Sequence, residues 1–190
     1  AAPRRGRDRV KGAGRVSVPD PARAARARYA RVQAAMAGEG AGALLLATPH
    51  LAAFASGARR VQVAGSGGAL PWVVITAGAP AAHVFTPDPD GAPPWMPRAS
   101  VEPLYWDRAR QLAHIRALVA PGRGALACDV FTPALAELAT TLGRPLIDAA
   151  PLLAAAATSK TADEVALVVR ALAAARAAVR AAGAAVGPGE

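Results

Sequence analysis

The sequence predicts an α/β fold, a layered mixed β-sheet flanked by helices. Short continuous apolar runs bounded by glycine or proline alternate along the chain with longer segments whose apolar residues recur every three or four positions. Continuous apolar runs are typical of strands covered on both faces, and strands that alternate with helices indicate helical layers against a sheet. The length of 190 residues fits one domain with flanking segments.

The first predicted element is a helix. Asp20 suits the N-cap and Pro21 the first helical position, and Gly38 and Gly40 end the helix. Pro103 favours an edge position for the last strand of this half, because proline lacks the N–H that a central strand needs. We expect a strand over 42–48, a helical turn over 49–54, a strand over 70–76, its hairpin partner over 81–85, a proline-rich loop over 86–97 and an edge strand over 101–105.

The second half continues the alternation. Asp107 caps a predicted helix that runs to residue 120, and Thr132 with Pro133 starts another that ends at Gly143. We expect strands over 124–128 and 145–148, and a helix over 149–157.

The closing stretch, 158–190, predicts a long helix that follows the domain. Thr161 and Glu164 form a capping box, in which the hydroxyl and the carboxylate each accept from the other residue's backbone N–H. The helix runs for roughly six turns before Gly183 and the segment 187–189 end it. Its apolar residues are Val165, Val168, Val169, Leu172 and Val179, and we expect Arg170, Arg176 and Arg180 to take most of its polar face.

Positive charge is concentrated at the N-terminus. The net charge is +9, and residues 1–31 hold ten Arg and Lys against two Asp, so the rest of the chain is close to neutral. Such an arm suits nucleic acid or an acidic surface, but it is more typical of a disordered tail without a partner. We interpret residues 1–19 as a basic disordered tail, 20–157 as the α/β domain and 158–190 as a linker with its helix.

Several classes of protein are disfavoured. One cysteine, Cys128, permits no disulfide within the chain, and its apolar surroundings predict a buried, inert thiol. No run approaches the ~18 apolar residues of a membrane span, and no apolar core follows the N-terminal charges as in a secretory signal. We therefore expect a cytoplasmic protein with no membrane partner.

The junction before the closing helix carries a resemblance. The order of residues here is Lys160, the acidic pair Asp163 and Glu164, an Ala-rich helix and then Pro188-Gly189-Glu190. This order resembles the start of the catalytic pita-bread domain of the creatinase/prolidase/aminopeptidase P family, the M24 metallopeptidases. The resemblance extends over about residues 25–190, although Phe54 and Ala55 stand where the family has Tyr and Leu. The upstream segments that resemble the family's N-terminal domain are 31–46, 49–57, 72–85 and 147–153.

The resemblance implies that this chain is the non-catalytic N-terminal domain of a metal-dependent hydrolase acting on Xaa-Pro peptide bonds, followed by the first helix of a truncated catalytic domain. The family's N-terminal domain serves dimerisation and substrate access. The parent protein would be a homodimer that binds a peptide substrate and two divalent metal ions (Mn, Co or Zn), which the absent domain would hold. Nucleic acid is not an expected partner on this hypothesis.

We expect no catalytic or metal-binding residue within the chain itself. His50, His83 and His114 are scattered without the spacing of metal ligands, and the glycine-rich stretch 65–68 lacks the lysine of a phosphate-binding loop.

Three residues are candidates for binding substrate across a dimer. Arg59 and Arg60 follow Gly57 in the loop region that, in the family, reaches the partner's active site, and a guanidinium suits an anionic group. Trp95, between prolines in a long loop, is the third. The alternatives are a solvated arginine pair and a tryptophan that packs on its own domain.

Two other functions stay open. The chain could be a stand-alone interaction module whose basic arm binds nucleic acid or another acidic partner. It could also belong to a non-peptidase pita-bread enzyme, a creatinase-like hydrolase or a lyase. Only sequence beyond Glu190 could show the metal ligands that separate the enzymes.

Overall fold

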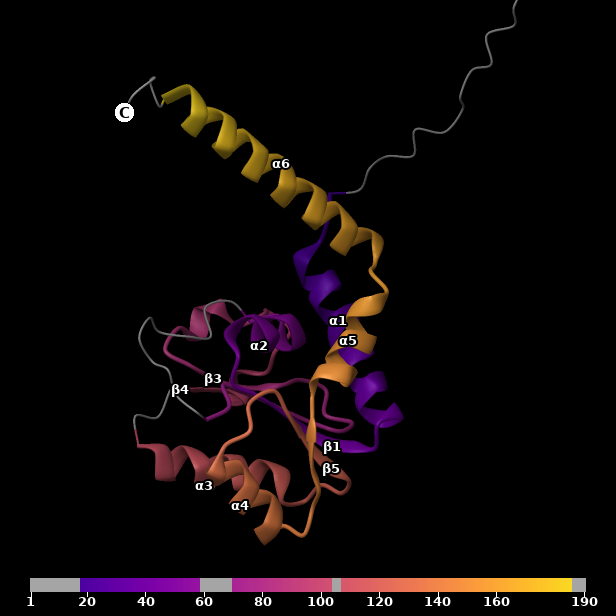
Figure 1. Ribbon diagram of the computed structural model, residues 1–190, viewed down its shortest axis with the longest axis vertical. Helices are drawn as coiled ribbons and strands as arrows, with labels where there is room; N and C mark the ends of the chain where they lie inside the picture. The colour runs from indigo at the N-terminus through magenta and orange to yellow at the C-terminus, as the bar shows by residue number, and fades with distance from the viewer. Residues whose placement is uncertain (1–17, 59–69, 104–106, 186–190) are drawn as a thin grey trace, which may run out of the picture.

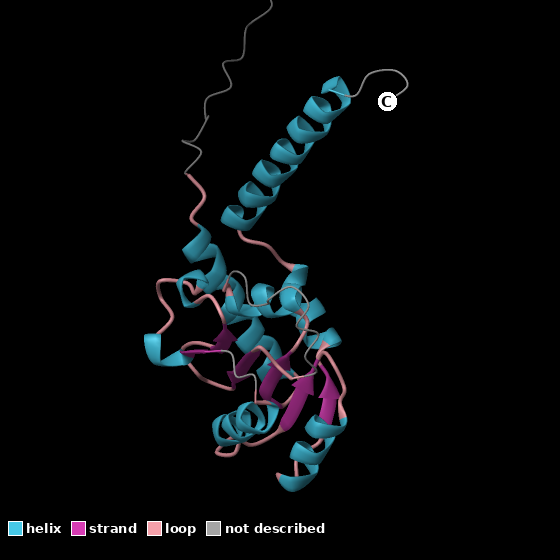
Figure 2. Cartoon of the chain, turned by 90° about the vertical axis from the view of Figure 1, so that its left-hand side faces the viewer, coloured by secondary structure: helices cyan, strands magenta, loops and turns pink. Residues whose placement is uncertain are grey.

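The computed structural model describes residues 18–58, 70–103 and 107–185, and every structural statement below concerns these residues. They form a six-stranded mixed sheet with helices on both faces, which confirms the predicted layered α/β fold (Figures 1 and 2). The strands are β1 Ala41–Leu46, β2 Val73–Thr76, β3 His83–Thr86, β4 Val101–Pro103, β5 Ala125–Cys128 and β6 Leu146–Asp148.

The strand order is β4-β3-β2-β1-β5-β6. Strand β2 runs antiparallel to both of its neighbours, and the other pairs are parallel. The predicted hairpin is therefore present as β2 and β3, and β4 lies at an edge, as Pro103 predicts.

The described residues also form six α-helices and two short 3-10 helices. The α-helices are α1 Pro21–Gly38, α2 Pro49–Ser56, α3 Arg108–Val119, α4 Pro133–Thr141, α5 Ala150–Thr158 and α6 Ala162–Ala185. The 3-10 helices, η1 Pro89–Gly91 and η2 Arg98–Ser100, lie before β4.

The sheet separates two hydrophobic clusters, and the alternation of side chains along β1 shows why. Leu44 and Leu46 point into the cluster shared with α1, α2 and α5, whereas Ala43 and Leu45 point into the cluster shared with α3 and α4. All six residues of β1 are buried, which explains its continuous apolar run.

The predicted helix caps are present. The carboxylate of Asp20 accepts from the backbone N–H groups of Ala22 and Arg23, that of Asp107 accepts from two N–H groups of α3, and the Thr132 hydroxyl accepts from Leu135. Each cap satisfies N–H groups that have no partner inside the helix.

Some element bounds differ from the prediction. The helical turn expected over 49–54 continues to Ser56, and Gly57 then closes it with a φ of +74°. The strand expected over 101–105 is described only as far as Pro103. The prediction that Gly183 ends the last helix is wrong: α6 runs through it, because one glycine costs only about 1 kcal/mol among alanines. The expected stop at 187–189 lies outside the described residues.

One arginine fastens the end of α3 to the start of β5. The guanidinium of Arg144 donates to the carbonyl oxygens of Val119 (2.7 Å), Gly124 (2.6 Å), Arg123 (3.3 Å) and Ala125 (3.4 Å). These include a carbonyl in the last turn of α3, where a positive charge also meets the helix dipole favourably.

We expect Arg144→Met to lower the free energy of unfolding by about 2 kcal/mol, because it removes the side-chain hydrogen bonds that join the end of α3 to the start of β5. Urea titration measures the loss. The neighbouring Arg123→Met is the matched control, since the Arg123 side chain is exposed and should change stability little. Equal losses in the two variants would contradict this role for Arg144.

Candidate functional site

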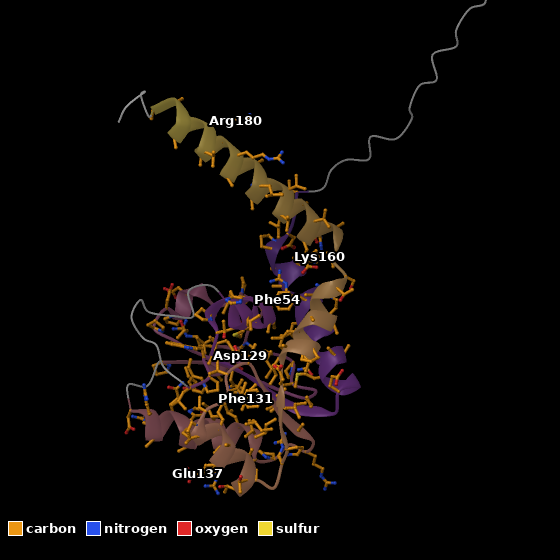
Figure 3. The ribbon with its side chains drawn as sticks, in the orientation of Figure 1. Phe54, Asp129, Phe131, Glu137, Lys160 and Arg180 are labelled. Atoms are coloured by element: carbon orange, nitrogen blue, oxygen red, sulfur yellow. The ribbon has the colours of Figure 1, made fainter. Side chains whose placement is uncertain are left out.

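Helix α6 leaves the packed layers and extends away from them (Figure 1). Every residue from Val168 to Ala185 is exposed, and Arg180 lies far from the sheet, whereas Lys160 lies at the base of the helix (Figure 3). The junction at Lys160 and the projecting helix are the most distinctive features of the described chain, and we take them as the candidate site.

The start of α6 is held against α1 by two consecutive carboxylates. Asp163 accepts a hydrogen bond from the Nε of Arg23 and one of 2.7 Å from its terminal nitrogen, and also accepts from the backbone N–H of Asp20 at 3.3 Å. The hydrogen bonds from Arg23 lower the pKa of Asp163, although burial opposes them.

Glu164 is held more extensively. Its carboxylate accepts from the Nε of Arg28 at 3.0 Å and, with both oxygens, from one nitrogen of Arg31 at 2.8 Å. The predicted capping box is also present, with Thr161 N–H donating to Glu164 at 2.8 Å and Glu164 N–H donating to the Thr161 hydroxyl at 3.2 Å. We call Arg23, Arg28, Arg31, Asp163 and Glu164 the ionic clamp.

The clamp reaches further into the domain through its arginines. The Nε of Arg31 donates to the carbonyl of Ala156 in α5, and the guanidinium of Arg28 lies 5.2 Å from the ring centre of Phe54 in α2. The arginines of α1 thereby connect the first turn of α6 to α5 and α2 as well. This fixed start determines the direction in which the rest of α6 projects.

The clamp predicts a dependence on acid. Burial by itself raises the pKa of Glu164, but the hydrogen bonds from Thr161, Arg28 and Arg31 outweigh it and lower the pKa from 4.5 to about 2. A carboxyl whose pKa is lower in the folded state stabilises that state above its ordinary pKa and loses this effect as the pH falls. We therefore expect the clamp to be complete above pH 4.5 and to weaken towards pH 2, as measured by hydrogen exchange of α6 amides. Protection of the α6 amides from hydrogen exchange that stays constant across this range would contradict the expected weakening of the clamp.

The far side of α6 carries an apolar stripe. Asp163 and Glu164 are buried against the domain, and the half-buried Leu167, which follows them by four and three residues, lies on the same side of the helix. The stripe, on the opposite side, consists of Val165 (49% exposed), Val168 (49%), Val169 (59%), Leu172 (52%) and Val179 (72%).

One arginine lies inside the stripe, which corrects the prediction that all three take the polar face. Arg176 follows Leu172 by four residues and precedes Val179 by three, so it shares their side of the helix. Arg180 follows Arg176 by four residues and borders the stripe, and only Arg170 lies on the opposite side. A partner of this surface therefore meets apolar contacts together with positive charge.

The predicted substrate-binding residues are not brought together among the described residues. Arg59 and Arg60 lie outside them, as does the glycine-rich stretch 65–68. Trp95 packs on its own domain, 5.5 Å from the ring of Tyr29 and 6.0 Å from the guanidinium carbon of Arg26.

Trp95 also lines a shallow pocket. The cavity measures about 260 Å³ and is completed by Arg26, Tyr29, Ala30 and Pro80. The indole N–H is buried and has no hydrogen-bond partner among the described residues. Because that N–H is turned into the protein, the pocket offers a ligand the ring and the Arg26 charge, and nothing in it marks a reaction centre.

The other polar candidates stay apart. Nε2 of His114 lies 3.8 Å from a carboxylate oxygen of Glu102, and within the described ranges no three His, Cys, Asp or Glu side chains are grouped to hold a metal ion. Cys128 is buried as predicted, and burial raises the pKa of its thiol to about 11. A thiol with this pKa stays protonated near neutral pH and is a poor nucleophile.

The comparisons with known proteins give no family. No protein-family model matches the chain, and no curated protein matches it. No helix in the described part of the chain combines the length and the apolar character that crossing a bilayer requires.

Sequence reasoning missed the arginine side of the clamp. It attributed the charge of residues 1–31 to an N-terminal arm, but Arg23, Arg28 and Arg31 lie in α1 and pair with the acidic residues that start α6. The local spacing offers no sign of these partners, because Lys160 already stands three residues before Asp163 and four before Glu164, where it could balance the acidic pair.

Proposed function

We propose that this chain is the non-catalytic N-terminal domain of an M24-type metallopeptidase of the Xaa-Pro aminopeptidase or dipeptidase kind, followed by the first helix of the catalytic domain. Its role is dimerisation and control of substrate access in a cytoplasmic parent enzyme. The single observation that carries the proposal is the junction. The residues on which the resemblance depends, from Lys160 to Glu164, lie where the packed layers end and α6 begins (Figure 3).

The geometry of the junction supports this function. A linker helix between two domains needs a fixed start and a surface for the second domain, and α6 has the ionic clamp at one end and an exposed apolar stripe beyond it. Exposed apolar surface of this kind marks an interaction site in soluble proteins. The reaction and its two divalent metal ions belong to the domain that follows α6, so we derive no chemical step from the residues described here.

The test begins with the natural product of the gene. An antibody raised against residues 25–150 identifies the protein in its host, and we expect a species well above the 19.1 kDa of this chain. The purified natural product is then assayed with Xaa-Pro peptides in the presence of Mn²⁺, Co²⁺ or Zn²⁺, where we expect metal-dependent hydrolysis. The 190-residue chain is the control and should hydrolyse none of them.

Two results would contradict the proposal. One is a natural product near 19 kDa, which would favour a stand-alone interaction module. The other is a longer product that binds no divalent metal ion and cleaves no Xaa-Pro bond.

A further inference from the structure

The apolar stripe of α6 has a chemical character that restricts what can cover it. It is made of aliphatic side chains alone, and Arg176 stands inside it between Leu172 and Val179. A guanidinium that is covered by an apolar surface without a partner is costly, so the covering surface must supply an acceptor there, and a carboxylate is the acceptor that also neutralises the charge.

We infer that α6 is a docking helix for an apolar protein surface that carries carboxylates, which pair with Arg176 and Arg180. This inference deepens the proposed function and rests on it in one respect only. If the proposed function holds, the partner is the domain that follows α6. The ionic clamp fixes the first turn of α6, so the stripe is presented in a set direction before the partner binds.

Charge argues against a second copy of this chain as the partner. From residue 165 to residue 185 the helix holds three arginines and no acidic residue. Asp163 and Glu164, the nearest carboxylates on the helix, are already bound by Arg23, Arg28 and Arg31. Two stripes facing one another would therefore bring like charges together, which disfavours the pair.

The distribution of residues also argues against a membrane surface. Helices that lie on membranes carry their basic residues on the polar face and Trp, Phe or Leu on the other. In α6 the basic residue Arg176 interrupts the apolar side, the stripe has no aromatic residue, and the opposite side is largely alanine. The alanines leave the side of α6 opposite the stripe without large side chains. The stripe itself matches a protein groove that carries aliphatic and acidic groups.

The experiment adds a defined probe to the full 190-residue chain. The probe is a fluorescein-labelled synthetic helix with leucines on one side and glutamates set among them, and binding is followed by fluorescence anisotropy. A second probe has lysine at every glutamate position. We expect the glutamate probe to bind, with an affinity that falls as salt is raised, and the lysine probe not to bind.

Matched variants locate the binding surface. Arg176→Gln should weaken binding of the glutamate probe about tenfold, whereas Arg170→Gln on the opposite side should change it less than about twofold. Leu172→Asn should weaken binding as well, and Ala174→Asn, on the side away from the stripe, is its control. All four positions are exposed, so the variants leave the core of the domain intact.

The outcomes separate the alternatives. The inference is overturned if the glutamate probe does not bind, if the lysine probe binds equally well, or if Arg170→Gln weakens binding as much as Arg176→Gln. Sedimentation that shows a dimer abolished by Leu172→Asn would assign the stripe to a second copy. Binding of phosphatidylserine vesicles that the same variant abolishes would assign it to a membrane. If the glutamate probe does not bind but the natural product is an active metallopeptidase, this inference alone is overturned. If the glutamate probe binds but the natural product has a mass near 19 kDa, only the proposed function is overturned.

Discussion

Gly42→Ala is expected to destabilise the domain strongly, because among the described glycines this position has the closest neighbouring atom. A β-carbon at Gly42 would stand 1.5 Å from the carbonyl oxygen of Arg123 and 2.6 Å from a guanidinium nitrogen of Arg144. Both distances are far inside van der Waals contact, so the backbone of β1 must separate from the segment before β5. We expect the free energy of unfolding to fall by about 3 kcal/mol or more.

The position explains the size of this effect. Gly42 lies at an irregularity in the pairing of β1 with β5, where Ala41 faces Ala125 and Ala43 faces Leu126. The carbonyl of Arg123, just before β5, also accepts a hydrogen bond of 3.3 Å from the guanidinium of Arg144, which lies between α4 and β6. A methyl group here therefore disturbs the central strand pair and the arginine together, in a domain whose total stability is of the order of 5–15 kcal/mol.

Gly38→Ala is the matched control, because it adds the same methyl group where no neighbouring atom lies within 4 Å. Gly38 is the last residue of α1, and alanine favours the helix by about 0.5 kcal/mol, so this variant should be neutral or slightly stabilised. Urea unfolding followed by circular dichroism compares the two. Wild-type stability in Gly42→Ala would show that β1 and the 123–124 segment are not as close as described.

The fold could be predicted to the extent that its signals are local. A helix cap is formed within three residues, so the caps could be predicted at Asp20, Asp107 and Thr132. Strand β1 could be predicted because both of its faces are covered and its sequence is therefore apolar throughout. The strand order was not predictable in this way. It depends on contacts between segments far apart in the sequence, such as β1 with β5, for which no single residue gives a sign.

The candidate site likewise has one part that the local sequence predicts and one part that depends on distant residues. The capping box of Thr161 and Glu164 is local, and it was predicted correctly. The partners of Glu164 are Arg28 and Arg31, more than 130 residues away in the chain, and no spacing in the sequence connects them. The side of α6 that Arg176 occupies follows from helix geometry, but its significance depended on knowing which side the domain covers.

Glu164→Gln is expected to release the first turns of α6 from the domain. Glutamine can keep the capping box, since its side-chain oxygen still accepts from the N–H of Thr161, but it removes the charge that Arg28 and Arg31 share. Removing one partner of a buried ion pair costs about 3 kcal/mol, and the Glu164 side chain is only 8% exposed. We expect hydrogen-exchange protection of the α6 amides nearest the clamp to fall about a hundredfold, while the amides of the sheet keep theirs.

Two controls separate the ion pairs from the cap and from charge in general. Glu137→Gln makes the same change on the exposed side of α4 and should leave α6 unchanged (Figure 3). Thr161→Ala removes the hydroxyl of the capping box but leaves the carboxylate with its arginines, so it should cost about 1 kcal/mol. A helix of 24 residues that is exposed over most of its length depends on such an anchored start, because an isolated helix is marginal in water. If α6 were as well protected in Glu164→Gln as in the wild type, the ion pairs of Glu164 would not be what holds the helix, and its direction would have to be set by the pair of Asp163 with Arg23 or by contacts of the stripe with a partner.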